Sequence, residues 1–122
     1  MGIHESGENY LETILLLSRK NGGVRSVDIV NELEISRPSV SKAMGILKND
    51  GMILIDRSGF ITLTDEGKAI AERIYERHRV LAELLVKIGV DEKTAAEDAC
   101  KIEHDISDIT FQCLKNHISN HR

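Results

Sequence analysis

The sequence contains few of the residues that mark several common classes of protein. Its 122 residues include no Trp, two Tyr, two Phe, one Pro and two Cys. The scarcity of aromatic residues predicts a core of aliphatic side chains, and two widely separated cysteines do not make a disulfide framework. No apolar run approaches the roughly 20 residues that a membrane span needs, and the N-terminus lacks the features of a secretory signal. We therefore expect a cytoplasmic protein without a membrane partner.

Acidic residues are in excess, and the formal net charge of −4 argues by itself against a nucleic-acid partner. The distribution of charge is more informative than its sum. Residues 36–59 carry four basic and two acidic side chains, whereas acids gather in the stretch DEKTAAEDACKIEHDISD at 91–108. One segment of an acidic chain is therefore locally basic.

Hydrophobic periodicity and turn residues divide the chain into helices and one hairpin. Apolar residues recur every three or four positions through most of the sequence, which is typical of amphipathic helices. Two short β-type runs around DRSG predict a hairpin with Gly59 in its turn. Ser26, Ser36 and Thr64 are predicted to cap the helices that follow them. The predicted helices cover residues 8–20, 26–33, 36–50, 64–88, 92–106 and 108–118, and the predicted strands cover 52–55 and 60–64.

A helix, a helix-turn-helix and a hairpin in this order form a winged helix-turn-helix. The predicted fold class is mainly α with a small β-hairpin. A winged helix-turn-helix DNA-binding domain covers residues 1–71, and a helical metal-binding and dimerisation domain covers residues 72–122. We expect the second domain to dimerise, because the winged-helix half has too few spare apolar positions to do so.

The winged helix is expected to bind double-stranded DNA, with its second helix-turn-helix helix in the major groove. The exposed side of that helix offers short donors and cations, which suit phosphates and base edges, and the hairpin tip adds a cation for the backbone. The alternative is a winged helix that contacts protein, with these polar residues merely solvated. The candidate DNA-contacting residues are Ser26, Ser36, Arg37, Pro38, Ser39, Ser41, Lys42, Arg57 and Ser58.

The stretch CKIEHDIS at 100–107 combines three potential metal ligands. Cys100, Glu103 and His104 would share one helix face, because offsets of three and four residues are about one turn. A thiolate, a carboxylate and an imidazole suit a borderline transition metal, and the paired Cys or His motifs of structural zinc sites are absent from the sequence. The alternative is an ordinary polar helix edge with a packed Cys.

Two other places could supply further ligands. His78 interrupts the apolar stripe of the long helix, where a His is more often a core residue with a hydrogen-bond partner. Asn9 and Glu12 share a face of the first helix, where a lone Glu is most often a surface charge. A site gathered from three helices would suit a regulatory metal, because binding would fix how those helices sit.

Six motifs together resemble one protein family. They are NYLETI (9–14), SRPSVSK (36–42), DRSGFITLTDEGK (56–68), RHRVLAELL (77–85), IGVDE (88–92) and ACKIEHDIS (99–107). They run nearly end to end, and the chain resembles the diphtheria toxin repressor family, particularly its short manganese-transport-regulator branch. The resemblance implies a homodimer with Fe(II) or Mn(II) as its cofactor. It also implies metal-activated repression of metal-uptake genes through a palindromic operator.

The resemblance also implies a set of metal ligands. Carried over by position, these are Asn9, Glu12, His78, Cys100, Glu103 and His104. Cys100 is the residue of iron-type members and Glu12 that of manganese-type members, whereas Asn9 matches neither type. The set is therefore a hybrid, which leaves the identity of the metal and the number of metal ions open.

The prediction from the whole sequence is a metal-dependent, DNA-binding transcriptional repressor that controls iron or manganese homeostasis genes. One alternative is a metal-independent winged-helix regulator with a vestigial metal site. A small metalloenzyme is a less favoured alternative. The sequence shows no pocket-forming Gly-rich loop or extra general base, and an enzyme would leave the winged helix unexplained.

Overall fold

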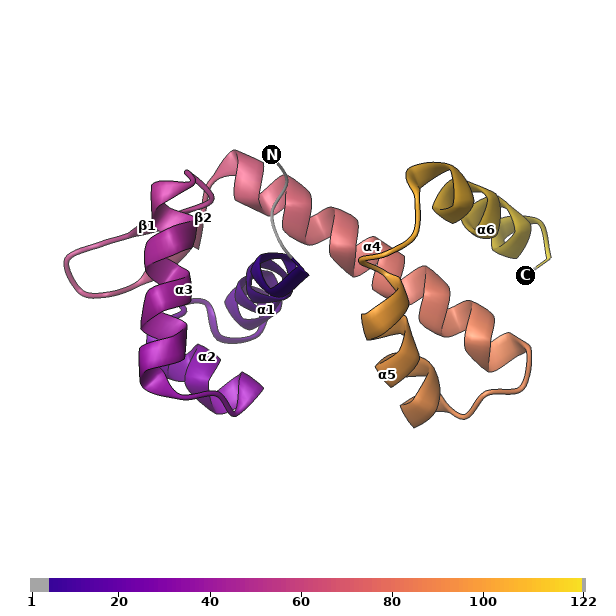
Figure 1. Cartoon of the computed structure of the whole chain (residues 1–122), viewed down its shortest axis with the longest axis horizontal. Coiled ribbons are helices and arrows are strands. Elements are labelled where there is room, and N and C mark those ends of the chain that lie inside the picture. The colour runs from indigo at the N-terminus through magenta and orange to yellow at the C-terminus, as the bar shows by residue number, and fades with distance from the viewer. Residues whose placement is uncertain (1–4, 122) are drawn as a thin grey trace. The chain divides into compact units, whose positions relative to one another are not determined.

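Residues 5–121 are described by the computed structural model as a mainly helical chain with one β-hairpin (Figure 1). In chain order, the elements are α1 (Glu5–Asn21), α2 (Ser26–Leu33), α3 (Arg37–Asn49), β1 (Ile53–Ile55), β2 (Ile61–Leu63), α4 (Asp65–Lys87), α5 (Glu92–Ile102) and α6 (Asp108–Asn120). Internal contacts divide the chain into a first unit that ends at Glu72 and a second that begins at Arg73, within α4. The predicted fold class is confirmed. No helix within residues 5–121 is long and apolar enough to cross a membrane.

The third helix begins as the sequence predicts. The Ser36 hydroxyl accepts a hydrogen bond from the Ser39 N–H at 3.3 Å, and Pro38 lies in the first turn, where its missing N–H costs little. Gly51 follows the helix with a φ of 76°, a conformation that glycine adopts without strain. The buried face of α3 consists of Val40, Met44 and Leu47.

The second helix begins and ends differently from its prediction. The prediction that Ser26 caps α2 is wrong, because Ser26 is the first helical residue. The Asp28 carboxylate instead accepts a hydrogen bond from the Arg25 N–H at 2.8 Å, and an acid three residues beyond the cap position satisfies that N–H without a hydroxyl. At the other end, Glu34 is left-handed with a φ of 54°, and its N–H bonds to the Val30 carbonyl.

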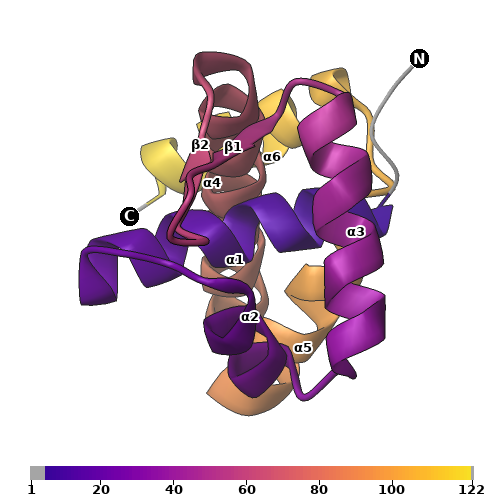
Figure 2. The same cartoon turned by 90° about the vertical axis from the view of Figure 1, so that its left-hand side faces the viewer.

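The hairpin is joined to the helix-turn-helix by main-chain contacts. The two strands pair antiparallel, with Leu54 opposite Thr62. The Ile61 N–H donates to the Val24 carbonyl at 2.7 Å, which ties β2 to the loop before α2. Around the hairpin, α1 contacts α2 and β2, while α3 contacts α2 and β1 (Figure 2).

The start of α4 lies directly on the turn between α3 and β1. The Thr64 hydroxyl accepts from the Gly67 N–H at 3.1 Å, which is the predicted cap, and it donates to the Gly51 carbonyl at 2.7 Å. The Thr64 N–H donates to the Met52 carbonyl at 3.0 Å. A Cβ at Gly67 would fall 2.1 Å from the Met52 carbonyl oxygen, so a side chain larger than hydrogen does not fit there.

Each unit buries a mainly aliphatic set of residues, as the scarcity of aromatic residues predicts, and Phe111 is the one aromatic member among the described residues. In the first unit the buried apolar residues are Leu11, Ile14, Leu15, Leu17, Val24, Ile29, Val40, Met44, Leu47, Met52, Ile53, Ile61 and Ala71. In the second unit they are Ile74, Val80, Leu81, Ala95, Ala99, Phe111 and Ile118.

The fifth helix ends four residues before its predicted end, at Ile102. After that residue the chain tightens into a turn, in which the Asp105 N–H donates to the Ile102 carbonyl at 3.0 Å instead of to the Lys101 carbonyl one position earlier. Arg77 holds this turn, because its Nη1 donates to the carbonyls of Glu103 at 3.2 Å and Ile106 at 2.9 Å. His104 consequently lies in a turn after α5, so the prediction that Cys100, Glu103 and His104 share one helix face is wrong for His104.

Candidate metal centre and nucleic-acid interface

Three side chains with metal-binding atoms converge in the second unit. His78 lies on α4, Cys100 lies in the last turn of α5, and Glu103 directly follows that helix. Their ligand atoms all lie within 4.8 Å of one another. Nδ1 of His78 is 3.0 Å from Glu103 Oε2 and 3.8 Å from Cys100 Sγ. Among residues 6–121, no other group of three His, Cys, Asp or Glu side chains meets in this way.

Glu103 is a fully buried carboxylate, with 0% of its surface exposed. Its Oε1 accepts no hydrogen bond from any residue that the structure describes, although His104 Nε2 lies 3.5 Å away. A buried anionic oxygen without a donor is strongly unfavourable, and a bound cation would satisfy it. The residues present therefore fit a divalent transition metal, both in the mixture of sulfur, oxygen and nitrogen donors and in this open oxygen.

The cluster holds His78 in its protonated form. Hydrogen bonds to the Cys100 sulfur and then to the Glu103 carboxylate raise the pKa of His78 from 6.5 to about 10, against the opposing effect of burial. At neutral pH the metal-free cluster therefore contains an imidazolium between two acidic groups. A metal ligand must be a neutral imidazole, so a proton and a metal compete for this residue.

Of the other predicted ligands, one is adjacent to the cluster in sequence and two lie in the first unit. His104 follows Glu103 directly, and only 1% of its side chain is exposed. Asn9 and Glu12 lie one turn apart on α1 in the first unit, and Glu12 is 9% exposed. The structure thus brings His78, Cys100 and Glu103 together, while Asn9 and Glu12 stay predicted ligands.

One buried charge was not anticipated from the sequence. Among residues 6–121, the buried charged side chains are Glu12, Arg77 and Glu103, and the two acids are predicted ligands. Arg77 is 3% exposed and directly precedes His78. Its spacing was the available signal, because Arg77 falls three residues after Ile74 and four before Leu81 on the apolar face of α4, whereas the exposed Arg79 does not.

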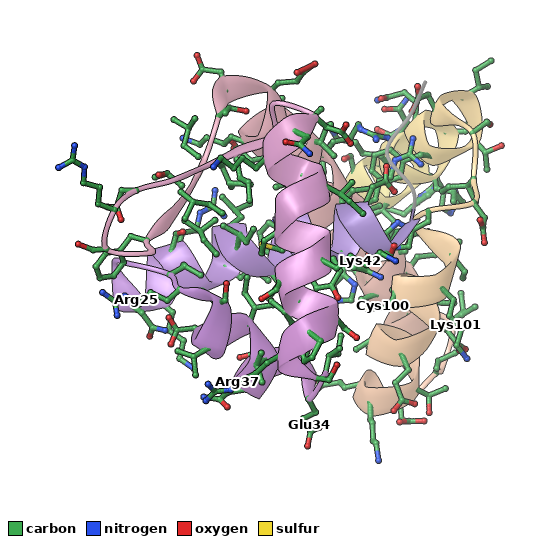
Figure 3. All side chains as sticks on the ribbon, turned by 60° about the vertical axis from the view of Figure 1, so that its left-hand side comes forward. Arg25, Glu34, Arg37, Lys42, Cys100 and Lys101 are labelled. Carbon is green, nitrogen blue, oxygen red and sulfur yellow. The ribbon has the colours of Figure 1, made fainter. Side chains whose placement is uncertain are left out.

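Most of the predicted DNA-contacting side chains of the first unit are exposed. Arg37 lies at the N-terminal end of α3, and Lys42 lies further along the same helix (Figure 3). The Ser36 and Ser39 hydroxyls bond to each other at 2.8 Å, which orients both at the helix start. Ser26 is partly buried, and the exposed candidates are Ser36, Arg37, Pro38, Ser39, Ser41, Lys42, Arg57 and Ser58.

The tip of the hairpin is organised by Asp56, which is not among the predicted site residues. Oδ1 of Asp56 accepts hydrogen bonds from the N–H groups of Ser58 and Phe60, each at 2.9 Å. Its main-chain carbonyl accepts from the Gly59 N–H at 3.0 Å, and Gly59 has a φ of 87° as its predicted turn role requires. These bonds hold Arg57 at an exposed, defined turn.

Arg25 is a second residue that sequence reasoning missed. Its guanidinium lies 4.5 Å from the centroid of the Phe60 ring, an attractive cation–π arrangement. A cation is therefore held where the start of α2 meets the hairpin. The sequence around Phe60 gives no signal that its ring contacts Arg25, which lies 35 residues earlier in the chain.

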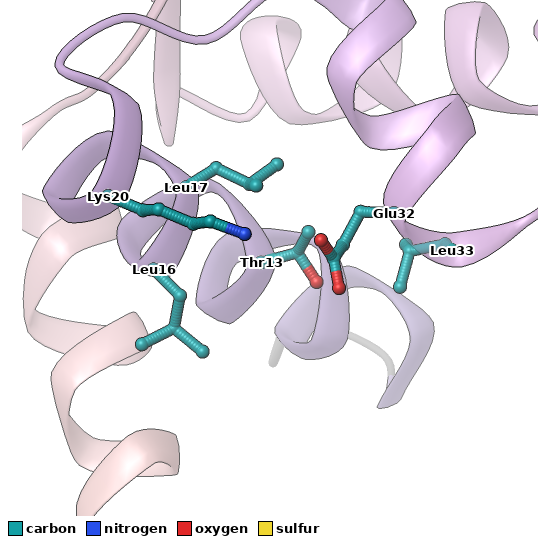
Figure 4. Close-up of a pocket in the computed structure, with 6 residues that line it drawn as sticks. All are labelled: Thr13, Leu16, Leu17, Lys20, Glu32 and Leu33. Carbon is teal, nitrogen blue, oxygen red and sulfur yellow. The ribbon is translucent and has the colours of Figure 1, made fainter.

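A cleft of about 220 Å³ lies between α1 and α2 in the first unit (Figure 4). Its lining residues are Thr13, Leu16, Leu17, Lys20, Glu32 and Leu33. None of these is a candidate ligand or a candidate DNA contact, so the cleft is separate from both sets.

Comparison with known proteins assigns the chain to a family. Residues 3–57 match the family described as "Iron dependent repressor, N-terminal DNA binding domain". Residues 64–122 match "Iron dependent repressor, metal binding and dimerisation domain". The chain belongs to the iron-dependent repressor family. This confirms the resemblance to the diphtheria toxin repressor and manganese transport regulator family that the motifs indicate.

Relatives of known sequence agree with this assignment. The chain is 34% identical over 113 residues to an uncharacterised HTH-type transcriptional regulator of Methanocaldococcus jannaschii, covering 91% of this chain and 90% of that one. It is 35% identical over 102 residues to the HTH-type transcriptional regulator MntR of Lysinibacillus sphaericus, covering 84% of this chain and 73% of that one.

Solved structures agree with the fold. The T. acidophilum IdeR structure is 28% identical with a TM-score of 0.82, over 98% of this chain and 55% of that one. The manganese regulator SloR is 25% identical, also with a TM-score of 0.82, over 98% of this chain and 55% of that one. The chain thus spans about half the length of these two proteins.

Family membership decides among the three functional alternatives. The chain is a metal-dependent, DNA-binding transcriptional regulator with a dimerisation domain, and its cofactor is a divalent metal. The family consists of regulators rather than enzymes, so a metalloenzyme is not favoured.

Proposed function

We propose that this chain is a cytoplasmic, homodimeric repressor that uses Fe(II) or Mn(II) to control genes of iron or manganese homeostasis. In this proposal, residues 1–71 bind DNA, and residues 72–122 bind metal and dimerise. The observation that carries it is the buried Glu103 carboxylate, which lies beside His78 and Cys100 and has one oxygen without a donor among residues 5–121. Such an anion is stabilised by a cation, so the state of the cluster depends on metal supply.

The proposed metal site combines the cluster with the remaining predicted ligands. The six proposed ligands are Asn9, Glu12, His78, Cys100, Glu103 and His104. When bound, a divalent metal supplies the positive charge that offsets repulsion among the thiolate and the two carboxylates. His78 gives up its proton to become a ligand, because only a neutral imidazole coordinates a metal.

The proposed DNA contacts come from the exposed side of α3 and from the hairpin tip. The proposed contacting residues are Ser26, Ser36, Arg37, Pro38, Ser39, Ser41, Lys42, Arg57 and Ser58. A homodimer presents two such surfaces, so we expect a palindromic operator with half-sites one DNA turn, or a multiple of one turn, apart. Metal and operator binding are coupled reciprocally, so the cognate duplex should tighten metal binding by the same factor.

Dimerisation through the second unit is supported by its exposed apolar residues. Ile109 is 78% exposed and Ile88 is 70% exposed, which makes them the most exposed large hydrophobic side chains among residues 6–121. Exposed apolar side chains of this size favour an interface when the fold includes a dimerisation domain.

The choice between the two metals depends on residues with opposite preferences. The sulfur of Cys100 favours softer, later metals, whereas the carboxylates of Glu12 and Glu103 suit Mn(II). We therefore expect Cys100→Glu to stay metal-responsive but to shift in preference towards Mn(II). The order of metals in anaerobic titrations with Fe(II), Mn(II), Co(II) and Zn(II) measures this shift.

The decisive experiment measures DNA binding against free metal. A duplex is selected from a random-sequence library with Mn(II)-loaded or Fe(II)-loaded protein, and its affinity is then titrated with metal for the parent chain and for Glu103→Gln. This substitution keeps the size and shape of the side chain but removes the charge. We expect Glu103→Gln to fold normally and to lose metal-stimulated DNA binding.

Glu97→Gln is the matched control, because Glu97 is an exposed acid on α5 that undergoes the same chemical change. This variant should respond to metal as the parent does. A normal metal response in Glu103→Gln would show that the cluster is not the sensor. Metal-independent binding by the parent chain would favour a winged-helix regulator with a vestigial site.

A further inference from the structure

A buried arginine holds the segment that carries two of the proposed metal ligands. Arg77 directly precedes His78 on α4, and its side chain is 4% exposed. Its guanidinium reaches residues 26 to 31 positions further along the chain, where it bonds to the carbonyls of Glu103 and Ile106 and to the Asp108 carboxylate. It also lies 5.3 Å from the centroid of the Phe111 ring.

These bonds join α4 to the start and the end of the segment between α5 and α6. After Ile102 the chain turns through residues 103–106, and α6 begins at Asp108 with the Ser107 hydroxyl accepting from the Thr110 N–H at 3.1 Å. Glu103 and His104 lie at the start of this turn. Their side chains can reach a common metal only if the main chain leaves α5 at a fixed angle.

The bonds of Arg77 are directed at main-chain oxygens of the turn, not at the Glu103 carboxylate. A buried cation beside a cation-binding cluster would weaken metal binding if its role were only electrostatic. The Asp108 carboxylate offsets that charge instead, and the Glu103 carboxylate remains available to His78 and to a metal. The arrangement therefore favours a role in placing Glu103 over a role in neutralising it.

We propose that Arg77 is a positioning residue for the metal centre. It fixes the main chain of residues 103–106, so that the carboxylate of Glu103 and the imidazole of His104 are held in place for a metal. This inference rests on the proposed metal site. A planar guanidinium can bridge two carbonyls and a carboxylate at once, whereas a lysine ammonium is a point donor on a flexible stem and cannot hold all three in one plane.

The test compares substitutions at Arg77 with the same substitutions at Arg79. Arg77→Lys keeps the charge, and Arg77→Met keeps much of the length without any donor. Arg79 is an exposed arginine two residues further along α4, packed against the Tyr75 ring at 5.2 Å, so Arg79→Lys and Arg79→Met are matched controls. Asp108→Asn is an intermediate variant, because it weakens one contact of Arg77 and leaves both carbonyl contacts in place.

Three measurements are made on each purified full-length variant. Co(II) affinity is measured by chelator competition, and the Co(II) absorption spectrum reports both thiolate coordination by Cys100 and the geometry of the site. Circular dichroism of the metal-free protein reports folding. Because residues that orient metal ligands typically change affinity by about 10- to 100-fold, we expect a loss of this size in Arg77→Lys and a larger one in Arg77→Met. Asp108→Asn should lose less, and the Arg79 variants should keep the parent affinity and spectrum.

The outcomes separate this inference from the proposed function on which it rests. If the parent chain binds no Co(II), or if Glu103→Gln binds it as well as the parent does, the proposed metal site is wrong and Arg77 has nothing to position. If the parent binds Co(II) and folded Arg77→Lys keeps the parent affinity and spectrum, only the positioning role is refuted. If neither Arg77 variant folds without metal, Arg77 serves the stability of the whole unit, and the positioning role is also refuted.

Discussion

Replacing Gly67 with Ala should destabilise the first unit, although the same change in an average helix is stabilising. Gly67 lies in the first turn of α4, where a Cβ would fall 2.1 Å from the Met52 carbonyl oxygen and 3.0 Å from its carbonyl carbon. Both atoms belong to the backbone, so they cannot move aside as the end of a flexible side chain can. Either the start of α4 or the turn before β1 must shift.

Two effects of opposite sign set the magnitude. Alanine gains up to about 1 kcal/mol over glycine in helix propensity. Against this, forcing extra atoms into a packed contact costs about 1–3 kcal/mol or more. The shift also strains the hydrogen bond from the Thr64 N–H to the Met52 carbonyl, a bond of a kind that contributes about 1 kcal/mol. We expect Gly67→Ala to lower the free energy of unfolding by about 1–3 kcal/mol.

Gly45→Ala is the control that isolates the close contact. Gly45 also lies within a helix, but no described atom comes within 4 Å of a Cβ built there. This variant should therefore raise the free energy of unfolding, by up to about 1 kcal/mol. Denaturant unfolding of the metal-free protein, followed by far-ultraviolet circular dichroism, measures both changes. Opposite signs are expected, and a Gly67→Ala variant at least as stable as the parent would refute the reasoning.

Three other expectations concern the end of α2, the metal centre and the DNA surface. Glu34→Gly should raise the free energy of unfolding by about 0.5–1 kcal/mol, because glycine relieves the left-handed backbone at a φ of 54°, whereas Glu34→Gln keeps the strain and should leave stability unchanged. Equal free energies of unfolding for the parent chain and Glu34→Gly, measured with denaturant, would contradict this. By proton NMR, His78 of the metal-free protein should stay protonated through neutral pH. Cys100→Ala should lower the midpoint of the His78 titration, since the hydrogen bond to the Cys100 sulfur is the largest cause of the raised pKa of His78. An ordinary midpoint near 6.5 in the parent would count against the cluster geometry. Lys42→Ala should weaken operator binding by about 1–3 kcal/mol if Lys42 reads a base, whereas uniform weakening across sequences with a smaller salt dependence would indicate a phosphate contact.

The pH dependence of stability follows from the same histidine. The pKa of His78 is raised from 6.5 to about 10 in the folded protein. Its contribution to the stability of the metal-free protein is therefore fully present below about pH 6.5. It is lost progressively as pH rises through about 10.

Local signals predicted most of the secondary structure. The Ser36 and Thr64 caps, the glycines at 51 and 59 and the apolar stripe of α3 are features of short segments, and each can be recognised within about two helical turns. The cap of α2 was assigned to the wrong residue, because Ser26 and Asp28 both suit the start of a helix. Only the backbone geometry distinguishes them.

The candidate site was predictable in its residue types but not in its geometry. Cys100, Glu103 and His78 were recognisable because soft and acidic ligands interrupt otherwise ordinary helices. The turn after α5 was not recognisable, since it is held by contacts that Arg77 makes with carbonyls 26 and 29 residues further on. Such a contact joins a side chain to main-chain atoms, and main-chain atoms are the same in every sequence. No pattern of residue types in the sequence can therefore predict such a contact.

The attachment of the hairpin to the helix-turn-helix limits where regulation can act. The bond from the Ile61 N–H to the Val24 carbonyl and the stacking of Arg25 on Phe60 hold the hairpin to the start of α2 without any metal. Each winged helix is therefore already organised for DNA, and ordering it adds little to the entropic cost of docking. We therefore expect metal binding to change the spacing between the two winged helices of a dimer rather than the internal structure of either one.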